Sequence, residues 1–212
     1  VLRLLAGLEH PSRGTARVAP RADGTAAALS YVFQDATLMP WASVFDNVWL
    51  PLRIAGVPRA AAAARIAPML AALGLGGFAA ALPAQLSGGM KMRASIARAL
   101  VTLPDVLLMD EPFAALDEIT RQRLNGDLLS MWHAQRFTAL FVTHSVFEAV
   151  FLAQRVVVMG ARPGRIVADL AVDAPYPRSA DWRLDPRYAA LCRAASAALE
   201  SAHAGDTVAG GA

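Results

Sequence analysis

The chain has 212 residues, enough for one domain with a sizeable core. Hydrophobic residues make up 56% of the sequence and charged residues 17%, a composition that excludes a largely disordered protein. The net charge of +3 comes from arginines dispersed among acidic residues, since Lys91 is the single lysine, and this dispersion argues against binding of nucleic acid. The most apolar stretch, residues 137–160, is interrupted by charged side chains and is not expected to span a membrane. With Cys192 as the only cysteine, no internal disulfide can form, and a reducing compartment such as the cytoplasm is expected.

The first part of the chain predicts a helix end, two strands and then a helical region. Leucines among the first eight residues have the spacing of one helix face, and short apolar runs predict strands over residues 15–18 and 26–33. Residues 40–84 are alanine-rich and are punctuated by prolines. This change of character predicts a helical subdomain inserted between strands.

The rest of the chain alternates helices with apolar strands. The expected elements are a helix over 87–100, a strand over 106–109, a helix over 118–135, strands over 138–142 and 155–159, and a helix over about 188–203. The Gly/Ala-rich tail that follows is expected to be frayed. Continuous apolar strands are typical of parallel sheets that are covered on both faces. The pattern therefore predicts an α/β fold with a mostly parallel sheet and helices on both faces of it.

An acidic pair follows the apolar strand 106–109. Asp110 and Glu111 stand at its C-terminal end, which is the edge where open parallel sheets bind ligands. One carboxylate there can hold Mg²⁺ through water, and its neighbour can polarise an attacking water, the two tasks that phosphoryl transfer leaves to acids. Taken alone, such a pair is more often a helix cap or a surface turn.

A second candidate site is the sequence Ser87-Gly88-Gly89, placed where a helix is expected to begin. Two glycines allow the backbone to approach a ligand closely, and the serine hydroxyl and free backbone N–H groups can bind phosphate oxygens. A capped turn explains these three residues equally well. The specific feature is the combination of LSGGM, the helix that follows, and the sequence LLMDEP some way beyond.

These segments together, LSGGMKMRASIARAL and VTLPDVLLMDEPFAALD, resemble the signature and Walker B region of ABC ATPases. The resemblance extends over nearly the whole chain. It implies a P-loop NTPase-like ABC ATPase domain over residues 1–175, with the family's helical subdomain at about 40–95. Residues 176–212 would then form a C-terminal helix and tail.

The resemblance also implies roles for single residues. Asp110 would bind Mg²⁺ through water, and Glu111 would be the general base. Gln34, after the strand AAALSYVF, matches the Q-loop glutamine, which contacts Mg²⁺ and the attacking water and links to the membrane subunits. Asp117 matches the D-loop aspartate that contacts the opposite subunit, and His144 matches the switch histidine that contacts the γ-phosphate.

By the same resemblance, Ser87, Gly88 and Gly89 would touch the γ-phosphate of an ATP molecule held by the other protomer. The implied cofactors are ATP and Mg²⁺, and the implied assembly is a homodimer of ATPase subunits. Taken singly, His144 would be a structural histidine and Gln34 an ordinary loop amide, so the prediction rests on their order and spacing.

The family's phosphate-binding loop, G-x-x-x-x-G-K-S/T, does not occur in these 212 residues, and Lys91 is not followed by Ser or Thr. The resemblance places Val1 directly after that loop. We therefore expect an N-terminally truncated chain, a fragment of a longer protein. By itself, this fragment is not expected to hydrolyse ATP.

Residues 33–48, together with Met90 and Met92, resemble importers of the nitrate, sulfonate and taurine group. This implies two integral-membrane permease subunits as partners and an indirect link to a periplasmic or surface substrate-binding protein. The expected location is peripheral, on the cytoplasmic face of the inner membrane. Trp41 and Trp49 are candidates for the groove that receives the permease, although buried packing is an equal alternative for both.

Two other classes of function stay open. An ABC-type ATPase of DNA repair or chromosome organisation shares the signature and the acidic pair, but the insert between Gln34 and Leu86 is compact and no long heptad segment occurs. The other alternative is an interaction protein that binds no nucleotide itself and completes a partner's ATP site through LSGGM alone.

Overall fold

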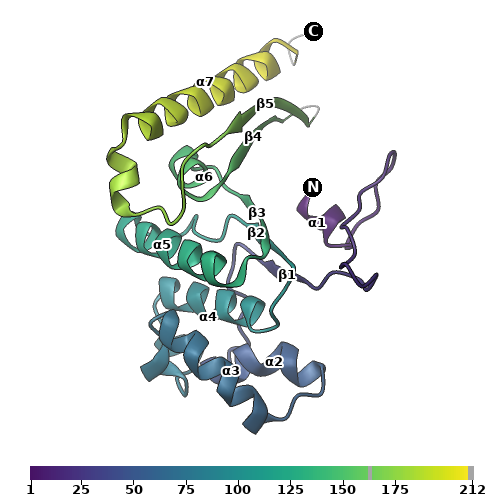
Figure 1. Ribbon diagram of the computed structural model, residues 1–212, viewed down its shortest axis with the longest axis vertical. Coiled ribbons are helices and arrows are strands. Elements are labelled where there is room, and N and C mark those ends of the chain that lie inside the picture. The colour runs from purple at the N-terminus through teal and green to yellow at the C-terminus, as the bar shows by residue number, and fades with distance from the viewer. Residues whose placement is uncertain (162–163, 210–212) are drawn as a thin grey trace. The chain divides into compact units, whose positions relative to one another are not determined.

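The computed structural model describes residues 1–161 and 164–209, with side chains as far as Ala202 (Figure 1). The backbone forms two compact units. The first comprises residues 1–127 and 134–142, and the second comprises residues 128–133 and the chain from 143 onward. Within the described ranges, no helix combines the length and the apolar character that crossing a bilayer requires.

A three-stranded parallel sheet is the centre of the first unit. Its strands are β1 (Leu29–Val32), β2 (Val106–Asp110) and β3 (Thr138–Val142), in the spatial order β1-β2-β3. In register, Val32 lies beside Met109, and Met109 lies beside Phe141. Because β2 is central, its apolar residues Leu107 and Leu108 are fully buried. The predicted α/β class with a parallel sheet is confirmed.

Asp105, just before β2, forms hydrogen bonds with residues at the beginnings of β1 and β3. Its Oδ2 accepts a hydrogen bond from the Ala28 backbone N–H at 2.6 Å, and its backbone carbonyl accepts one from the Thr138 N–H at 2.8 Å. One residue thus connects the beginnings of all three strands. The carboxyl ends of the strands, where the candidate site residues follow, consequently lie along the opposite edge.

The helical part of the first unit lies between β1 and β2 in the chain. It contains α2 (Val44–Ile54), α3 (Arg59–Ala72), α4 (Gly88–Leu100) and two short 3₁₀ turns, η1 (Gly76–Phe78) and η2 (Pro83–Gln85). Ser43 caps α2 by accepting a hydrogen bond from the Asp46 N–H at 3.1 Å. Buried Asn47 links the same helix to the preceding loop through Met39. Of the prolines predicted to punctuate this region, Pro51 and Pro68 lie inside α2 and α3, whereas Pro58 is the N-cap of α3 and Pro83 begins η2.

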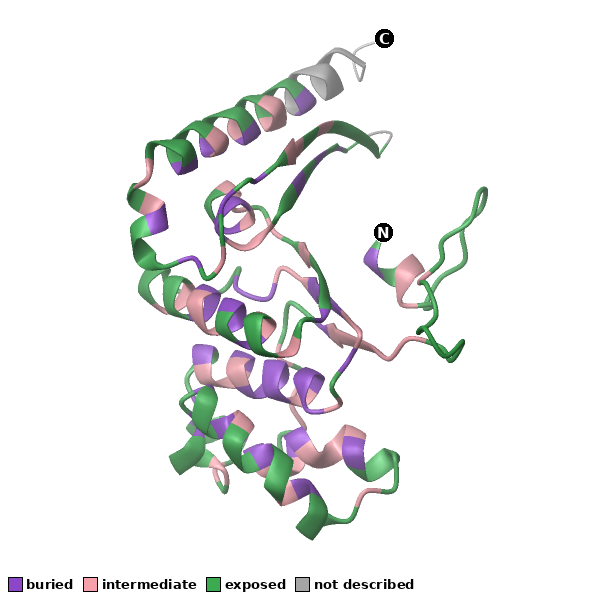
Figure 2. Ribbon diagram, viewed as in Figure 1, coloured by how far each residue is buried: buried purple, intermediate pink, exposed green. Residues whose placement is uncertain are grey.

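Helix α4 connects this helical part to the sheet, since it contacts α2, α3 and β1. Most of its residues are buried, as the purple colouring in Figure 2 shows. The expected helix over 87–100 is confirmed, with Ser87 as the N-cap rather than the first helical residue. Helix α5 (Glu118–Gln135) follows β2 and contributes residues to both units.

The segment before β1 differs from the prediction. Helix α1 (Leu2–Leu5) is short and contacts β2, but the strand predicted over 15–18 is wrong, because that segment pairs with no strand among the described residues and is largely exposed. The strand predicted over 26–33 is shorter, 29–32. Isolated extended backbone gains no ladder hydrogen bonds, so an apolar run without a neighbour does not become a strand.

The second unit consists of a hairpin with helices packed against it. Its elements are α6 (Val146–Leu152), β4 (Arg155–Gly160), β5 (Arg165–Ala171), η3 (Ala180–Leu184) and α7 (Pro186–Ala209). Its core includes Val150, Phe151, Val156, Trp182 and Tyr188. Helix α7 begins earlier and ends later than the C-terminal helix predicted over about 188–203. Part of the tail predicted to be frayed lies outside the described residues.

Two strand predictions are corrected. The run 155–159 does not extend the parallel sheet, because β4 pairs antiparallel with β5, a strand that sequence reasoning missed, and its residues alternate between exposed and buried. Strand β3 is not covered on both faces, since it ends the three-stranded sheet and most of its side chains are exposed, including Leu140 and Val142. An uninterrupted apolar run thus did not distinguish a central strand from an edge strand.

Candidate functional site

Asp110 is the last residue of β2 and is half-buried at the carboxyl edge of the sheet. The hydroxyl of Tyr31, on the neighbouring strand β1, donates a hydrogen bond to Asp110 Oδ2 at 3.0 Å. Burial is the main cause that raises the pKa of Tyr31 to about 12, and the hydrogen bond to Asp110 is the second. At neutral pH the phenol therefore stays protonated and acts as the donor, which fixes the orientation of the Asp110 carboxylate.

Glu111 follows Asp110 in an unusual backbone conformation. Its φ of 47° lies in the left-handed region, which side chains other than glycine rarely occupy. Its N–H donates to the Val142 carbonyl at 3.0 Å, and its own carbonyl accepts from the Ala114 N–H at 3.1 Å. These two bonds hold the turn by which the chain leaves the strand immediately after Asp110.

Gln34 stands two residues beyond the end of β1 and is exposed. Because β1 and β2 run parallel with Val32 beside Met109, Gln34 leaves the sheet at the same edge as Asp110 and Glu111. The structure therefore brings these three predicted residues to one edge of the sheet.

Ser87 and the two glycines form the beginning of α4. The Ser87 hydroxyl oxygen accepts a hydrogen bond from the Met90 N–H at 3.3 Å, as an N-cap residue does. Gly89 is buried, and a Cβ on it would lie 2.7 Å from Thr120 Cγ2, so no larger residue fits without a shift. Ser87 and Gly88 are exposed. The turn is thus a capped helix start packed against α5, which leaves an exposed hydroxyl and backbone at its tip.

Asp117 caps the beginning of α5. Its Oδ1 accepts a hydrogen bond from the Thr120 N–H at 2.9 Å, and this bond lowers the pKa of the exposed carboxyl group. Leu116 lies next to Gly88, and a Cβ added at Gly88 would be 3.8 Å from Leu116 Cδ2. Asp117 therefore lies at the junction of α4 and α5, beside the Ser87 turn.

His144 belongs to the second unit, where it is exposed between the end of β3 and the Ser145 N-cap of α6. The predicted residues thus fall into three places: Gln34, Asp110 and Glu111 at the sheet edge, the Ser87 turn with Asp117 at the α4–α5 junction, and His144 in the other unit. Ser145 caps α6 by accepting from the Glu148 N–H at 3.3 Å, which orients the chain just after His144.

The sheet edge has the donor set that Mg²⁺ prefers. Asp110 supplies a carboxylate and Gln34 an amide oxygen, both hard oxygen donors. Tyr31 donates to Asp110 Oδ2, so Oδ1 is the oxygen that an ion or its bound water would meet. Mg²⁺ commonly keeps several waters and takes only one or two protein ligands, so two donors of this type fit the ion.

Sequence reasoning missed Tyr31 and Arg98. Tyr31 is the second-to-last residue of β1, the strand next to the one that ends in Asp110, and the alternation of side chains along β1 was the signal that could have identified it. Arg98 donates three hydrogen bonds to the loop after Gln34, a long-range contact that no local pattern reveals. Of the two tryptophans, Trp41 is 78% exposed, whereas Trp49 is partly buried and donates to the Val57 carbonyl.

An acidic pair and an amide at the carboxyl edge of a parallel sheet are typical of α/β domains that bind and hydrolyse nucleotides. Comparison with known proteins agrees with this class. The model of the ABC transporter family matches residues 1–114. A putative ATP-binding protein of Brucella abortus is 46% identical over 191 residues, which cover 90% of this chain and 74% of that protein.

Two further relatives have more specific names. The taurine import ATP-binding protein TauB of Rhizobium johnstonii is 51% identical over 142 residues, covering 67% of this chain and 54% of that protein. The nitrate import ATP-binding protein NrtD of a Synechocystis strain is 44% identical over 176 residues, covering 82% and 66%. The chain belongs to the ABC transporter family, so the predicted family is confirmed. The roles assigned to single residues stay predictions.

Proposed function

We propose that the chain supplies the catalytic residues named above to the ATP-hydrolysing subunit of an ABC importer for small oxyanions, sulfonates or related nutrients, of the nitrate, sulfonate and taurine type. The observation that carries the catalytic part is the arrangement of Asp110, Glu111 and Gln34 at one sheet edge, with Asp110 oriented by Tyr31. The importer type rests on the relatives that are named for taurine and nitrate import.

In this proposal, Asp110 and Gln34 hold Mg²⁺ with ATP, Asp110 through a bound water. The ion, when bound, neutralises charge on the phosphate oxygens. Glu111 accepts a proton from the attacking water, and His144 contacts the γ-phosphate. The Tyr31 hydrogen bond keeps one carboxylate oxygen occupied, so that Asp110 presents the other one in a constant direction.

The Ser87 turn takes part through a second copy of the chain. Ser87 and Gly88 are exposed, at the positive end of a 13-residue helix, and can contact the γ-phosphate of an ATP molecule on the opposite subunit. Asp117 lies beside that turn and would meet the partner as well. The homodimer would act on two membrane permease subunits at the cytoplasmic face of the membrane and, through them, receive cargo from a substrate-binding protein.

The test uses the intact transporter with Glu111→Gln. Removal of the general base is expected to lower ATP turnover about 10²-fold to 10⁴-fold while ATP binding is retained. Glu118→Gln changes a nearby exposed carboxyl group at the start of α5 and serves as the matched control, with turnover expected to stay near that of the wild type. Unchanged turnover in Glu111→Gln would show that Glu111 is not the base.

Mixed dimers test whether the site is shared between subunits. Ser87→Arg and Glu111→Gln are each expected to be inactive alone. A mixture of the two should recover ATPase activity, because one of the two sites in a mixed dimer then has both an intact Glu111 and an intact Ser87. If the mixture stays inactive although mixed dimers form, the Ser87 turn does not serve the opposite subunit. Uptake of labelled taurine and nitrate by the wild-type transporter then identifies the cargo class.

A further inference from the structure

The loop after Gln34 is attached to helix α4 by one side chain. Arg98, near the C-terminal end of α4, donates from Nη1 to the Thr37 carbonyl at 2.8 Å. Its Nη2 donates to the Ala36 carbonyl and to Thr37 Oγ1, both at 3.0 Å. Both residues that accept these bonds lie within three positions of Gln34.

The backbone of this loop is in a conformation that it would not adopt without support. Thr37 has a φ of 44°, in the left-handed region, which is rare for a β-branched residue. Such a conformation persists only where surrounding contacts hold it. The bonds from Arg98 to both the carbonyl and the hydroxyl of Thr37 are the contacts that do so.

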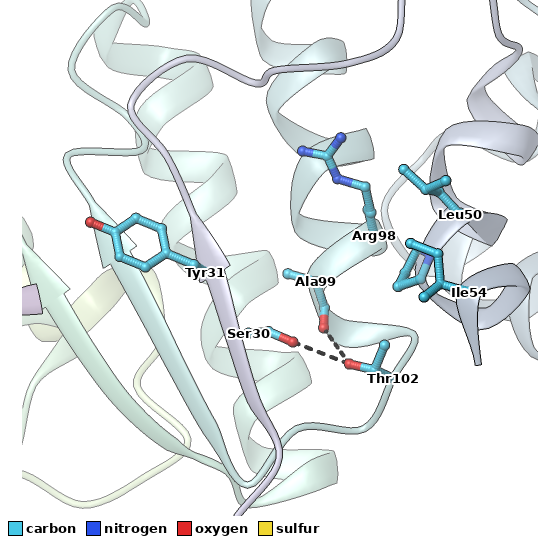
Figure 3. A pocket seen from close by; sticks show the side chains of 8 residues that line it. Ser30, Tyr31, Leu50, Ile54, Arg98, Ala99 and Thr102 are labelled. Atoms are coloured by element: carbon cyan, nitrogen blue, oxygen red, sulfur yellow. Dashed lines mark hydrogen bonds between the residues drawn. The ribbon is translucent and has the colours of Figure 1, made fainter. Parts of the chain in front are cut away.

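The guanidinium of Arg98 is held by hydrogen bonds more than by packing. It borders a pocket of about 230 Å³ that is also lined by Tyr31, Leu50 and Ile54, so one of its sides is not packed against protein (Figure 3). Among the described residues no carboxylate forms an ion pair with Arg98, and burial lowers its pKa. Arg98 instead donates to neutral oxygens, those of Ala36 and Thr37. The planar guanidinium can bond several of these oxygens at once, which the single ammonium group of a lysine cannot do in the same geometry.

Helix α4 is fixed at the same end to the sheet. The Thr102 hydroxyl, two residues beyond α4, lies 3.1 Å from the Ser30 hydroxyl of β1 and donates to the Ala99 carbonyl at 3.0 Å (Figure 3). The other end of α4 is the Ser87 turn. A 13-residue α-helix is stiff, so a displacement at its Arg98 end is transmitted to its Ser87 end.

We propose that Arg98 is a positioning residue that joins the Gln34 loop to the helix of the Ser87 turn, so that the loop and the turn move together. This inference rests on the proposed function, since it assigns Gln34 to the Mg²⁺ site and the Ser87 turn to the opposite nucleotide. Loss of Arg98 releases the loop without removing any residue that touches ATP, Mg²⁺ or the reacting atoms.

Hydrogen exchange of the backbone amides tests the structural part, independently of any ATPase activity. In Arg98→Lys, the Met39 amide, which donates to Asn47 Oδ1 at 2.7 Å, is expected to exchange about tenfold faster or more than in the wild type, because the loop before it loses the hydrogen bonds that order it. The matched control is Arg93→Lys on the same helix, since Arg93 bonds the Leu73 carbonyl and Asp127 and not the loop. Exchange of the Met39 amide should be unchanged in the control.

The dependence of ATP hydrolysis on Mg²⁺ tests the functional part in the intact transporter. Arg98→Lys is expected to raise the Mg²⁺ concentration for half-maximal turnover about threefold or more, and excess Mg²⁺ should restore part of the rate. A merely structural role would reduce the amount of active protein and leave that midpoint in place. Thr37→Ala removes one of the three acceptors, together with the γ-methyl group, and leaves both backbone carbonyls in place, so it should shift the midpoint less than Arg98→Lys.

Equal exchange of the Met39 amide in the wild type and Arg98→Lys would overturn the inference, as would an unchanged Mg²⁺ midpoint in a folded Arg98→Lys variant. A wild-type transporter without ATPase activity would overturn the proposed function instead. In that case the exchange experiment still decides whether Arg98 orders the loop.

Discussion

Glu111 combines a predicted catalytic side chain with a backbone conformation that favours glycine. Its φ of 47° costs about 1–2 kcal/mol for a residue with a Cβ atom. The neighbouring hydrogen bonds to Val142 and Ala114 impose this conformation from both sides. A glutamate retained where glycine would be more stable is consistent with a role for its carboxyl group.

Substitution at this position should separate stability from activity. Glu111→Gly is expected to be more stable than Glu111→Ala by about 1 kcal/mol, because only glycine adopts a positive φ without strain. Urea unfolding of both variants measures the difference, and neither variant should hydrolyse ATP. The same pair at Arg123, exposed inside α5, should give the opposite order, since glycine lowers helix stability by about 1 kcal/mol relative to alanine. Equal stabilities at position 111 would mean that the turn relaxes.

At the scale of elements, the close contact of α4 with α5 depends on Gly89. Sequence reasoning assigned Gly89 to ATP binding, and the structure adds a second reason for a glycine. The Cβ of any other residue would lie 2.7 Å from Thr120 Cγ2, a distance at which the Thr120 side chain or one of the two helices has to shift.

Gly89→Ala is therefore expected to lower the free energy of unfolding by about 1–3 kcal/mol. Thr120→Ser deletes the methyl group in question, so the double variant should regain most of this loss. Gly88→Ala is the matched control, because a Cβ there meets Leu116 at an ordinary distance of 3.8 Å and should change stability by less than about 0.5 kcal/mol. Chemical denaturation of the wild type, Gly89→Ala, Thr120→Ser and the double variant measures the coupling between the two positions. Additive effects would show that the Thr120 methyl group is not the obstacle.

In the second unit, Arg178 donates hydrogen bonds to the carbonyl groups at the end of α6. This buried side chain donates to the carbonyls of Val150, Phe151 and Ala153 near the end of α6, and to those of Val172 and Ala174 after β5. Burial lowers the pKa of the guanidinium, but its charge is solvated by five carbonyl oxygens. The carbonyls at the end of α6 have no following helical turn to donate to them, whereas the Val172 carbonyl also accepts from the Ala174 N–H at 3.0 Å.

Arg178→Ala is expected to destabilise the protein by about 3 kcal/mol, because it leaves buried carbonyls without donors. Arg178→Lys should also be destabilising, since an ammonium group cannot reach both sets of carbonyls. Arg193→Ala, at an exposed position of α7, should stay within about 0.5 kcal/mol of the wild type. Thermal and urea unfolding provide the comparison, and a wild-type-like Arg178→Ala would mean that water replaces the guanidinium.

At the scale of the whole molecule, the ionisation of the three tyrosines makes the stability of both units depend on pH. Tyr31 lies in the first unit, and Tyr176 and Tyr188 lie in the second. Burial is the main cause that raises the pKa of each, to about 12 for Tyr31. A raised pKa stabilises the fold below the unfolded value of about 10, and this contribution is lost as the pH rises through the folded value.

We therefore expect little tyrosinate absorbance from the folded protein at about pH 10, and about half of the full signal from the unfolded protein at the same pH. Stability should fall steeply as the pH is raised further toward 12, the approximate pKa of Tyr31. Tyr31→Phe should make this fall in stability smaller, and the part that is left comes from Tyr176 and Tyr188, whose pKa values are also raised. Half-ionised tyrosines in the folded protein at pH 10 would contradict the burial of these groups.

Most of the fold could be predicted because local rules decide it. Ser87 before a helix, the apolar run before Asp110 and the helix from Glu118 each follow from capping or from periodicity. The wrong or missed elements, the strand over 15–18 and β5, are segments whose state depends on a pairing partner. A strand needs a neighbour, and sequence periodicity does not say which one is present.

The sequence by itself determined the family, the parallel sheet and the residues predicted to perform the chemistry, because motifs of adjacent residues carry that information. Only the tertiary structure decided that Tyr31 orients Asp110, that Gly89 is required by Thr120, and that Arg98 holds the loop after Gln34. These contacts join residues 31 to 79 positions apart in the chain. Hydrogen bonds and steric contacts form between neighbours in space, and folding alone makes such distant residues neighbours.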